Sequence, residues 1–166
     1  MSQDTSSSRR PLPSRDELRI WRDYIETSEV LRRVMGARMQ SRSSISSGDY
    51  AVLLALSEAK DRAMRSSDLA EHIGWDRSRL SHHLGRMEKR SLIRRERCPE
   101  DSRGCLVAVT DDGLQQFRCS SVPHLRDVRQ LFVEPLTPQQ LAAIGEAMIA
   151  LRAHLEAAPD PSPRDH

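Results

Sequence analysis

The sequence contains no run of about 18 consecutive apolar residues, which is the length that a transmembrane helix needs. No apolar run follows the charged residues near the N-terminus, so we expect no secretory signal. There are three cysteines, and an odd number does not form a complete disulfide framework. We therefore expect a cytoplasmic protein whose thiols are reduced.

Motifs typical of enzymes are missing as well. The sequence has no Gly-rich phosphate loop, no His-Glu-x-x-His and no Gly-x-Ser-x-Gly. Its carboxylates are scattered over exposed helical faces, and no pair is placed for acid–base catalysis. We therefore expect neither an enzyme nor a bound cofactor.

The 166 residues are 37% hydrophobic and 30% charged, which fits one folded domain with flanking arms. Residues 1–14 and 157–166 are rich in Ser, Arg, Pro or Asp, and we expect them to be a disordered arm and tail. Between them, hydrophobic periodicity predicts a mainly α fold with a small β-hairpin.

Helices are predicted where apolar residues recur at steps of three and four. A long amphipathic helix over 16–39 comes first, and a more apolar core helix over 48–59 follows it. One short helix is predicted to end at Gly74, and another follows it. A later helix contains Pro123, which should kink it, and the last helix starts at Pro138. The residues expected to cap these helices are Ser46 or Ser47, Ser66, Asp76 and Thr137.

Residues 69–84 have the spacing of a helix-turn-helix. Ala70 is small where the two helices cross, and Gly74 stands where the turn needs a positive φ. The second helix has an apolar face that consists of Leu80, Leu84 and Met87.

The opposite face of that second helix is cationic. Residues 77–97 contain eight cations and only two carboxylates, which is typical of a surface that binds an anionic polymer. Such a helix fits the DNA major groove, where Arg77 and Arg79 could bind guanine. The other candidate contacts to bases or phosphates are Ser78, Ser81, His82, Arg86, Lys89 and Arg97.

Strands are predicted over 92–98 and 105–110, joined by a loop rich in turn residues. Arg103 lies at the tip of this hairpin and could enter a minor groove, with Asp101 holding its guanidinium. A helix-turn-helix followed directly by a basic hairpin is a winged helix.

These residues resemble the MarR family of bacterial transcription regulators, and the resemblance covers about residues 16–156. The segments that carry it are Asp76-Arg77-Ser78-Arg79-Leu80-Ser81, Leu84, Met87-Glu88, Leu92-Ile93, Arg95, Pro99-Glu100-Asp101-Ser102-Arg103, Val109-Thr110 and Gly113. The family's wing typically reads Asp-x-Arg and then Leu-Thr-x-x-Gly, and here Val109 replaces the leucine.

The resemblance implies a homodimer built from the terminal helices. We expect dimerisation helices over 15–45 and 113–156 around a DNA-binding domain over 46–112. The amphipathic terminal helices agree with this, since the last one carries a narrow apolar seam that favours a helix opposite. The expected dimer contacts are Leu18, Trp21, Ile25, Leu141, Ile144, Met148, Leu151 and Leu155.

The function expected from these features is a homodimeric, sequence-specific regulator of transcription. We expect a repressor that binds a pseudo-palindrome in double-stranded DNA and is released by a small, aromatic ligand. Family members bind such ligands between their two parts, where Trp21, Tyr24 and Met35 could lie.

Three alternatives remain open. Redox sensing would use Cys98, Cys105 or Cys119, although family sensors of the peroxide type carry their reactive thiol near the first helix. Metal sensing has little support, because the histidines lack a tight ligand spacing and we predict no metal site. In a winged helix that binds protein rather than DNA, the cationic segment would be a solvated face.

Overall fold

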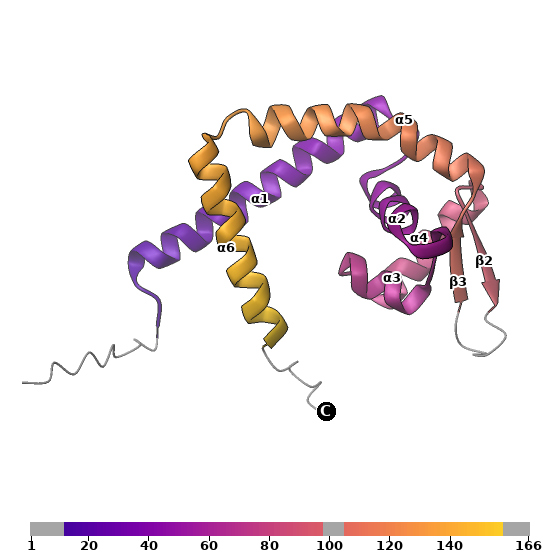
Figure 1. Ribbon diagram of the computed structural model, residues 1–166, viewed down its shortest axis with the longest axis horizontal. Helices are drawn as coiled ribbons and strands as arrows, with labels where there is room; N and C mark the ends of the chain where they lie inside the picture. Colours follow the sequence, from indigo (N-terminus) through magenta and orange to yellow (C-terminus); the bar gives the residue numbers. More distant parts are fainter. Residues whose placement is uncertain (1–11, 98–104, 158–166) are drawn as a thin grey trace, which may run out of the picture. The chain divides into compact units, whose positions relative to one another are not determined.

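The computed structural model describes residues 12–97 and 105–157. The chain divides into two units, Met1–Ser120 and Ser121–His166. The first unit contains α1 (Arg15–Arg42), α2 (Ser47–Glu58), η1 (Lys60–Arg62), β1 (Ala63–Arg65), α3 (Ser66–Ile73), α4 (Arg77–Lys89), β2 (Ile93–Arg97), β3 (Cys105–Val109) and the start of α5 (Asp111–Val128) (Figure 1). Of the arm and tail expected over 1–14 and 157–166, positions 1–11 and 158–166 lie outside the described residues. Ser14 instead caps α1, and Ala157 is the last residue of the final helix.

Two helices of the first unit begin with reciprocal capping boxes. The Ser14 hydroxyl accepts from the backbone N–H of Glu17, and the Glu17 carboxylate accepts from the N–H of Ser14. Ser46 and Asp49 repeat this arrangement at the start of α2, so the prediction of a cap at this point is confirmed.

Two other predicted caps differ from the structure. Ser66 is the first residue of α3 rather than its cap, because Arg65 ends β1 in an extended conformation and leads directly into the helix. Asp76 does occupy the position before α4, but its side chain makes no capping hydrogen bond. Neither cap therefore uses the side chain that the sequence suggested.

The three strands form one antiparallel sheet in the order β1-β3-β2. The predicted hairpin is β2 and β3, in which Ile93 is paired with Val109. The strand β1 was not predicted; it pairs Ala63 with Ala108 on the other edge of β3. A strand of three residues is too short to show an alternating pattern, so only its pairing defines it.

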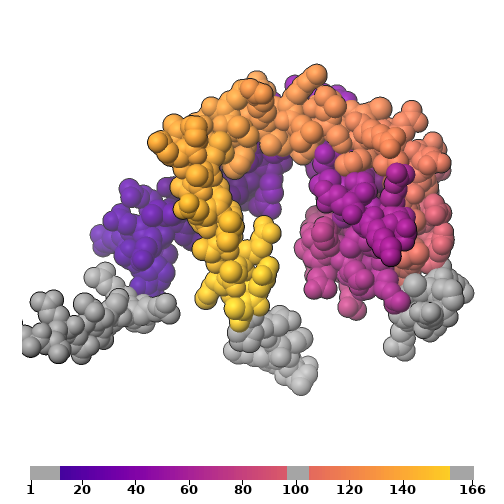
Figure 2. All heavy atoms as spheres, in the orientation of Figure 1, coloured from indigo at the N-terminus to yellow at the C-terminus, as the bar shows by residue number. Residues whose placement is uncertain are grey.

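A hydrophobic core joins α2, α3, α4 and the sheet. The largest fully buried apolar side chains are Ile45, Val52, Leu53, Leu56, Leu69, Leu80, Leu84, Met87, Ile93 and Val107. In the space-filling view these elements form one continuous packed body (Figure 2). The expectation that α2 is a core helix is confirmed, and only its Leu54 among the large apolar side chains is exposed.

The second unit consists of the end of α5, the π-turn η2 (Arg129–Val133) and α6 (Pro138–Ala157). The helix α5 continues through Pro123 to Val128. At the start of α6 the hydroxyl of Thr137 accepts from the N–H of Gln140 at 3.2 Å, as the predicted cap requires. Among the described residues, no helix is both long and apolar enough to cross a bilayer.

Candidate nucleic-acid interface

The helix-turn-helix consists of α3, a tight turn and α4. Gly74 has φ +65° and ψ 37°, a left-handed conformation that glycine adopts without strain. The N–H of Trp75 donates to the carbonyl of Ala70 at 2.9 Å and closes the end of α3. The turn therefore sets the direction of α4 relative to α3.

The two faces of α4 differ as the sequence predicts. Leu80, Leu84 and Met87 are buried in the core. The outer face is exposed and carries Arg77, Ser78, Arg79, Ser81, His82, Arg86 and Lys89. Among the described residues, neither Arg77 nor Lys89 has a carboxylate within 4.0 Å. This face therefore offers cations and hydroxyl groups to the solvent.

The cationic segment is less uniform than its composition suggests. Arg94 pairs with Glu96 at 2.7 Å, and Arg95 pairs with Glu88 at 2.5 Å. This contact lowers the pKa of the Glu88 carboxyl and raises the pKa of Arg95. The two carboxylates of the segment thus pair with cations on β2. They do not pair with the cations on the outer face of α4.

Two arginines of the outer face contact aromatic rings. The guanidinium carbon of Arg79 lies 4.3 Å from the centroid of the Trp75 ring, which is a cation–π distance. Nη2 of Arg86 lies 3.0 Å from Nδ1 of His83. The roles of His83 and Trp75 were not predicted, because these contacts depend on how α4 follows the turn.

A buried carboxylate lies behind α4. Asp49 is 2% exposed and lies 2.9 Å from Nε2 of His83 and 2.7 Å from Nη1 of Arg90. Burial alone raises the pKa of this carboxyl, but the hydrogen bonds from His83, the Ser46 N–H and Arg90 outweigh it and hold the pKa well below its ordinary value. Asp49 therefore stays ionised and joins α2 to α4. The one sequence signal for it was the capping box that starts at Ser46.

The wing is described only in its strands. Arg103 and Asp101, the predicted contact and its support, lie outside the described residues, as does Cys98. Arg97 ends β2 and its backbone is paired with Cys105. The described part of the hairpin therefore ends at Arg97 on β2 and begins again at Cys105 on β3.

Two residues of the family-like motif after the wing have clear structural roles. The hydroxyl of Thr110 donates to the carbonyl of Ser91 at 2.5 Å and accepts from the N–H of Gly113 at 3.0 Å. A Cβ on Gly113 would lie 1.9 Å from the carbonyl oxygen of Leu92. Thr110 and Gly113 thus pack the start of α5 against the turn between α4 and β2.

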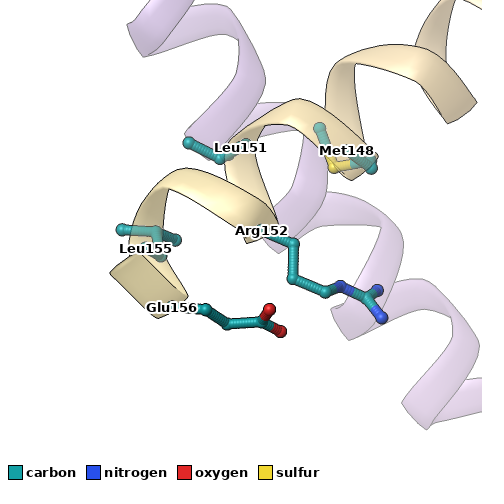
Figure 3. A pocket seen from close by; sticks show the side chains of 5 residues that line it. All are labelled: Met148, Leu151, Arg152, Leu155 and Glu156. Atoms are coloured by element: carbon teal, nitrogen blue, oxygen red, sulfur yellow. The ribbon is translucent and has the colours of Figure 1, made fainter. Parts of the chain in front are cut away.

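The expected dimer and ligand residues lie on the long helices. In α1, Leu18, Trp21, Tyr24 and Ile25 are exposed and Met35 is half-buried, and the rings of Trp21 and Tyr24 lie 6.5 Å apart. No residue of α6 is buried. A shallow hollow on α6 is lined by Met148, Leu151, Arg152, Leu155 and Glu156 (Figure 3). Of the seam residues, Leu141, Ile144 and Met148 are half-buried and Leu151 and Leu155 are exposed.

The thiols and histidines of the described residues are dispersed. Cys105 is half-buried in β3, and Cys119 is exposed on α5. Within 12–97 and 105–157 there is no group of three or more His, Cys, Asp or Glu side chains that could hold a metal ion.

Comparison with known proteins identifies the family. Residues 43–104 match a family model described as MarR family. The chain is 33% identical to AbsC, a MarR family transcriptional regulator from Streptomyces coelicolor, with 89% of this chain and 99% of AbsC covered and a TM-score of 0.80. It is also 33% identical to Sco3205, a MarR family transcriptional regulator from the same organism whose structure is in complex with DNA. The match covers 93% of this chain and 96% of Sco3205, with a TM-score of 0.82.

A third neighbour is the PcaV transcriptional regulator from Streptomyces coelicolor, whose structure is in complex with its natural ligand. It is 27% identical, with 80% of this chain and 91% of PcaV covered and a TM-score of 0.65. The fold agrees with the comparisons, since the chain has a winged helix-turn-helix. It is 33% identical to AbsC and Sco3205 over nearly their whole length. This chain belongs to the MarR family of transcriptional regulators.

Proposed function

We propose that the protein is a homodimeric repressor that binds a pseudo-palindromic sequence in double-stranded DNA through α4 and the wing. The observation that carries the proposal is the exposed face of α4, where cations and hydroxyl groups gather and the nearby Glu88 is paired with Arg95. The DNA complex of Sco3205, a relative with 33% identity, supports it. A face that only kept the protein in solution would mix both charges.

Each side chain of the face has a proposed role. Arg77 and Arg79, in the first turn of α4, bind guanine O6 and N7 in the major groove. Arg86 and Lys89 lie further along the helix and bind phosphates, which position the protein without reading sequence. The side chains that contact either bases or phosphates are Ser78, Ser81 and His82. At the wing, Arg103 enters a minor groove and Asp101 holds its guanidinium. Arg97 is a further contact to bases or phosphates.

Dimerisation follows from the apolar side chains that the long helices leave exposed. Leu18, Trp21 and Ile25 on α1 are at least 39% exposed, and the seam on α6 ends in the exposed Leu151 and Leu155. Burying this area in a symmetric pair is favourable, and it sets two copies of α4 about one DNA turn apart. We assign dimerisation to residues 15–45 and 113–156, and DNA binding to 46–112.

A small aromatic ligand releases the repressor from its operator in this proposal. PcaV, at 27% identity, is a regulator known with its natural ligand bound. The side chains proposed to take part here are Trp21, Tyr24 and Met35. The rings of Trp21 and Tyr24 are exposed and 6.5 Å apart, so they offer a surface on which an aromatic molecule can stack.

The test starts from a pool of random duplexes from which the purified protein selects its own site. We expect nanomolar affinity for the selected duplex and a steep fall in affinity as salt rises. Arg79→Ala should weaken binding to it about tenfold or more, since a bidentate contact to a base contributes about 1–3 kcal/mol. Arg103→Ala should also weaken binding, because it removes the cation that is proposed to enter the minor groove. Arg19→Ala, which removes an exposed arginine from α1, is the matched control and should bind as the wild type does.

Two results would reject the proposal. A pool from which the protein enriches no sequence would exclude specific DNA binding. Equal affinities of Arg79→Ala, Arg103→Ala and wild type for the selected duplex would show that another surface binds the DNA.

A further inference from the structure

Among the described residues, two arginines on the outer face of α4 contact rings rather than carboxylates. Arg79 stacks on Trp75 with 4.3 Å between its guanidinium carbon and the ring centroid. Arg86 donates from Nη2 to Nδ1 of His83 over 3.0 Å. A ring orients a guanidinium without neutralising its charge, so both cations remain available to an anionic partner.

The two rings also contact each other. The planes of Trp75 and His83 are nearly perpendicular, at 87°, and their centroids are 5.1 Å apart, which is a favourable edge-to-face arrangement. Both rings rest against Gly48 in the first turn of α2. A Cβ on Gly48 would lie 2.9 Å from Cε1 of His83 and 3.0 Å from Cη2 of Trp75. Only glycine leaves room for both rings in this arrangement.

The contact with Arg86 fixes the tautomer of His83. A guanidinium has no acceptor, so Nδ1 of His83 must accept from Arg86 and the ring proton is on Nε2. Nε2 is buried, 2.9 Å from the Oδ1 of Asp49, and has no other partner among the described residues. The carboxylate is fixed in turn by Arg90 at 2.7 Å. A chain of contacts therefore runs from α2 through His83 to Arg86.

We propose that Trp75 and His83, seated on Gly48, are positioning residues that hold Arg79 and Arg86 ready for DNA. The inference rests on the proposed function, because it assigns the two rings a role in binding rather than only in the core. Arginine has a long, rotatable side chain that loses entropy when it is immobilised on a partner. Ordering it before the encounter reduces that loss and increases affinity.

The first experiment is a double-mutant cycle on Trp75 and Arg79, read on the duplex that the wild-type protein selects from a random pool. Trp75→Leu should weaken binding about tenfold, while Trp75→Phe keeps a ring and should lose less. If Trp75 acts through Arg79, the double variant Trp75→Leu/Arg79→Ala binds no more weakly than Arg79→Ala alone. Additive losses would overturn the positioning role, because they would mean that Trp75 acts independently.

The second experiment uses two variants of His83. Asparagine can present its amide oxygen where Nδ1 lies, so His83→Asn should remain within about threefold of the wild type. His83→Leu cannot accept from Arg86 and should bind about tenfold more weakly. This loss should disappear in the Arg86→Ala background, and equal binding by His83→Leu and wild type would overturn the assignment.

The third experiment separates positioning from stability. Gly48→Ala displaces both rings, so affinity should fall about fivefold at a temperature at which circular dichroism shows that the variant is fully folded. The matched control is Gly36→Ala, whose Cβ would meet only the Ser47 hydroxyl at an ordinary 3.4 Å. Wild-type affinity in Gly48→Ala would overturn the seating of the rings.

The outcomes distinguish the two proposals. A wild-type protein that selects no duplex rejects the proposed function and this inference with it. A wild-type protein that selects a duplex, combined with additive cycles and tight binding by Gly48→Ala, rejects only the positioning role of the rings.

Discussion

The guanidinium of Arg90 lies 2.7 Å from the carboxylate of Asp49, although 41 residues separate them in the sequence. A second nitrogen of the same guanidinium donates to the carbonyl of Ser44 at 2.6 Å. The residue that follows α4 is thereby bonded to the first turn of α2 and to the segment before it. One arginine of the cationic segment thus has a structural partner, and its charge is compensated within the protein.

We predict that Asp49→Asn destabilises the fold by about 2 kcal/mol, because His83 and Arg90 lose the negative charge that they share. The free energy of unfolding in urea measures this. Glu58→Gln, which alters an exposed side chain of the same helix, should change it by less than about 0.5 kcal/mol. If the two variants were equally stable, the Asp49 cluster would not contribute to folding.

The same carboxylate predicts a pH dependence. The pKa of Asp49 is depressed in the folded protein, so its contribution to stability is fully present above the ordinary value of 3.8. This contribution is lost as the pH falls below that value towards the folded-state pKa. The difference in unfolding free energy between wild type and Asp49→Asn should therefore shrink in acid, and a difference that stayed constant between pH 7 and pH 3 would contradict the assignment.

Gly113→Ala should destabilise the protein by about 3 kcal/mol or more, because its Cβ would meet the Leu92 carbonyl oxygen at 1.9 Å and the backbone would have to move. Chemical denaturation monitored by circular dichroism measures the loss. Gly145→Ala is the control, since a Cβ there meets nothing within 4 Å and should stabilise α6. Equal stability of Gly113→Ala and wild type would be inconsistent with this packing of α5.

Leu151→Asp should convert the proposed dimer to a monomer, because it places a charge in the exposed apolar seam of α6. Sedimentation velocity measures the oligomeric state. Ala153→Asp introduces the same charge on the opposite side of the helix, since two residues correspond to a rotation of about 200°. A wild-type monomer, or a dimer that persists in Leu151→Asp, would contradict the seam as the dimer contact.

Local signals in the sequence were sufficient for most elements. Ser46, Gly74 and Thr137 mark helix ends through interactions within a few residues, and all three were predicted. The apolar face of α4 follows from helical periodicity alone, and Leu80, Leu84 and Met87 are indeed buried. The roles proposed for Arg77, Arg79 and the other side chains of the outer face remain predictions.

Contacts between distant residues were not predictable in this way. The strand β1 exists because Ala63 pairs with Ala108, and no property of three residues reveals such a partner. The neighbours of the His83 side chain, Asp49 and Trp75, come from two other segments of the chain. Ser66 was expected to be a cap and is not, because the preceding residue ends a strand that the sequence did not indicate.

By itself, the sequence determined the order of the α-helices and the β-hairpin, the helix-turn-helix and the separation of an apolar from a cationic face on α4. These features depend on periodicity and on interactions between near neighbours, which one segment encodes alone. Only the tertiary structure decided which cations are paired, which are held by rings, and which carboxylate is buried. Those outcomes depend on the side chains that folding brings together from α2, the turn and α4, and their burial and charge exist only once the core has formed.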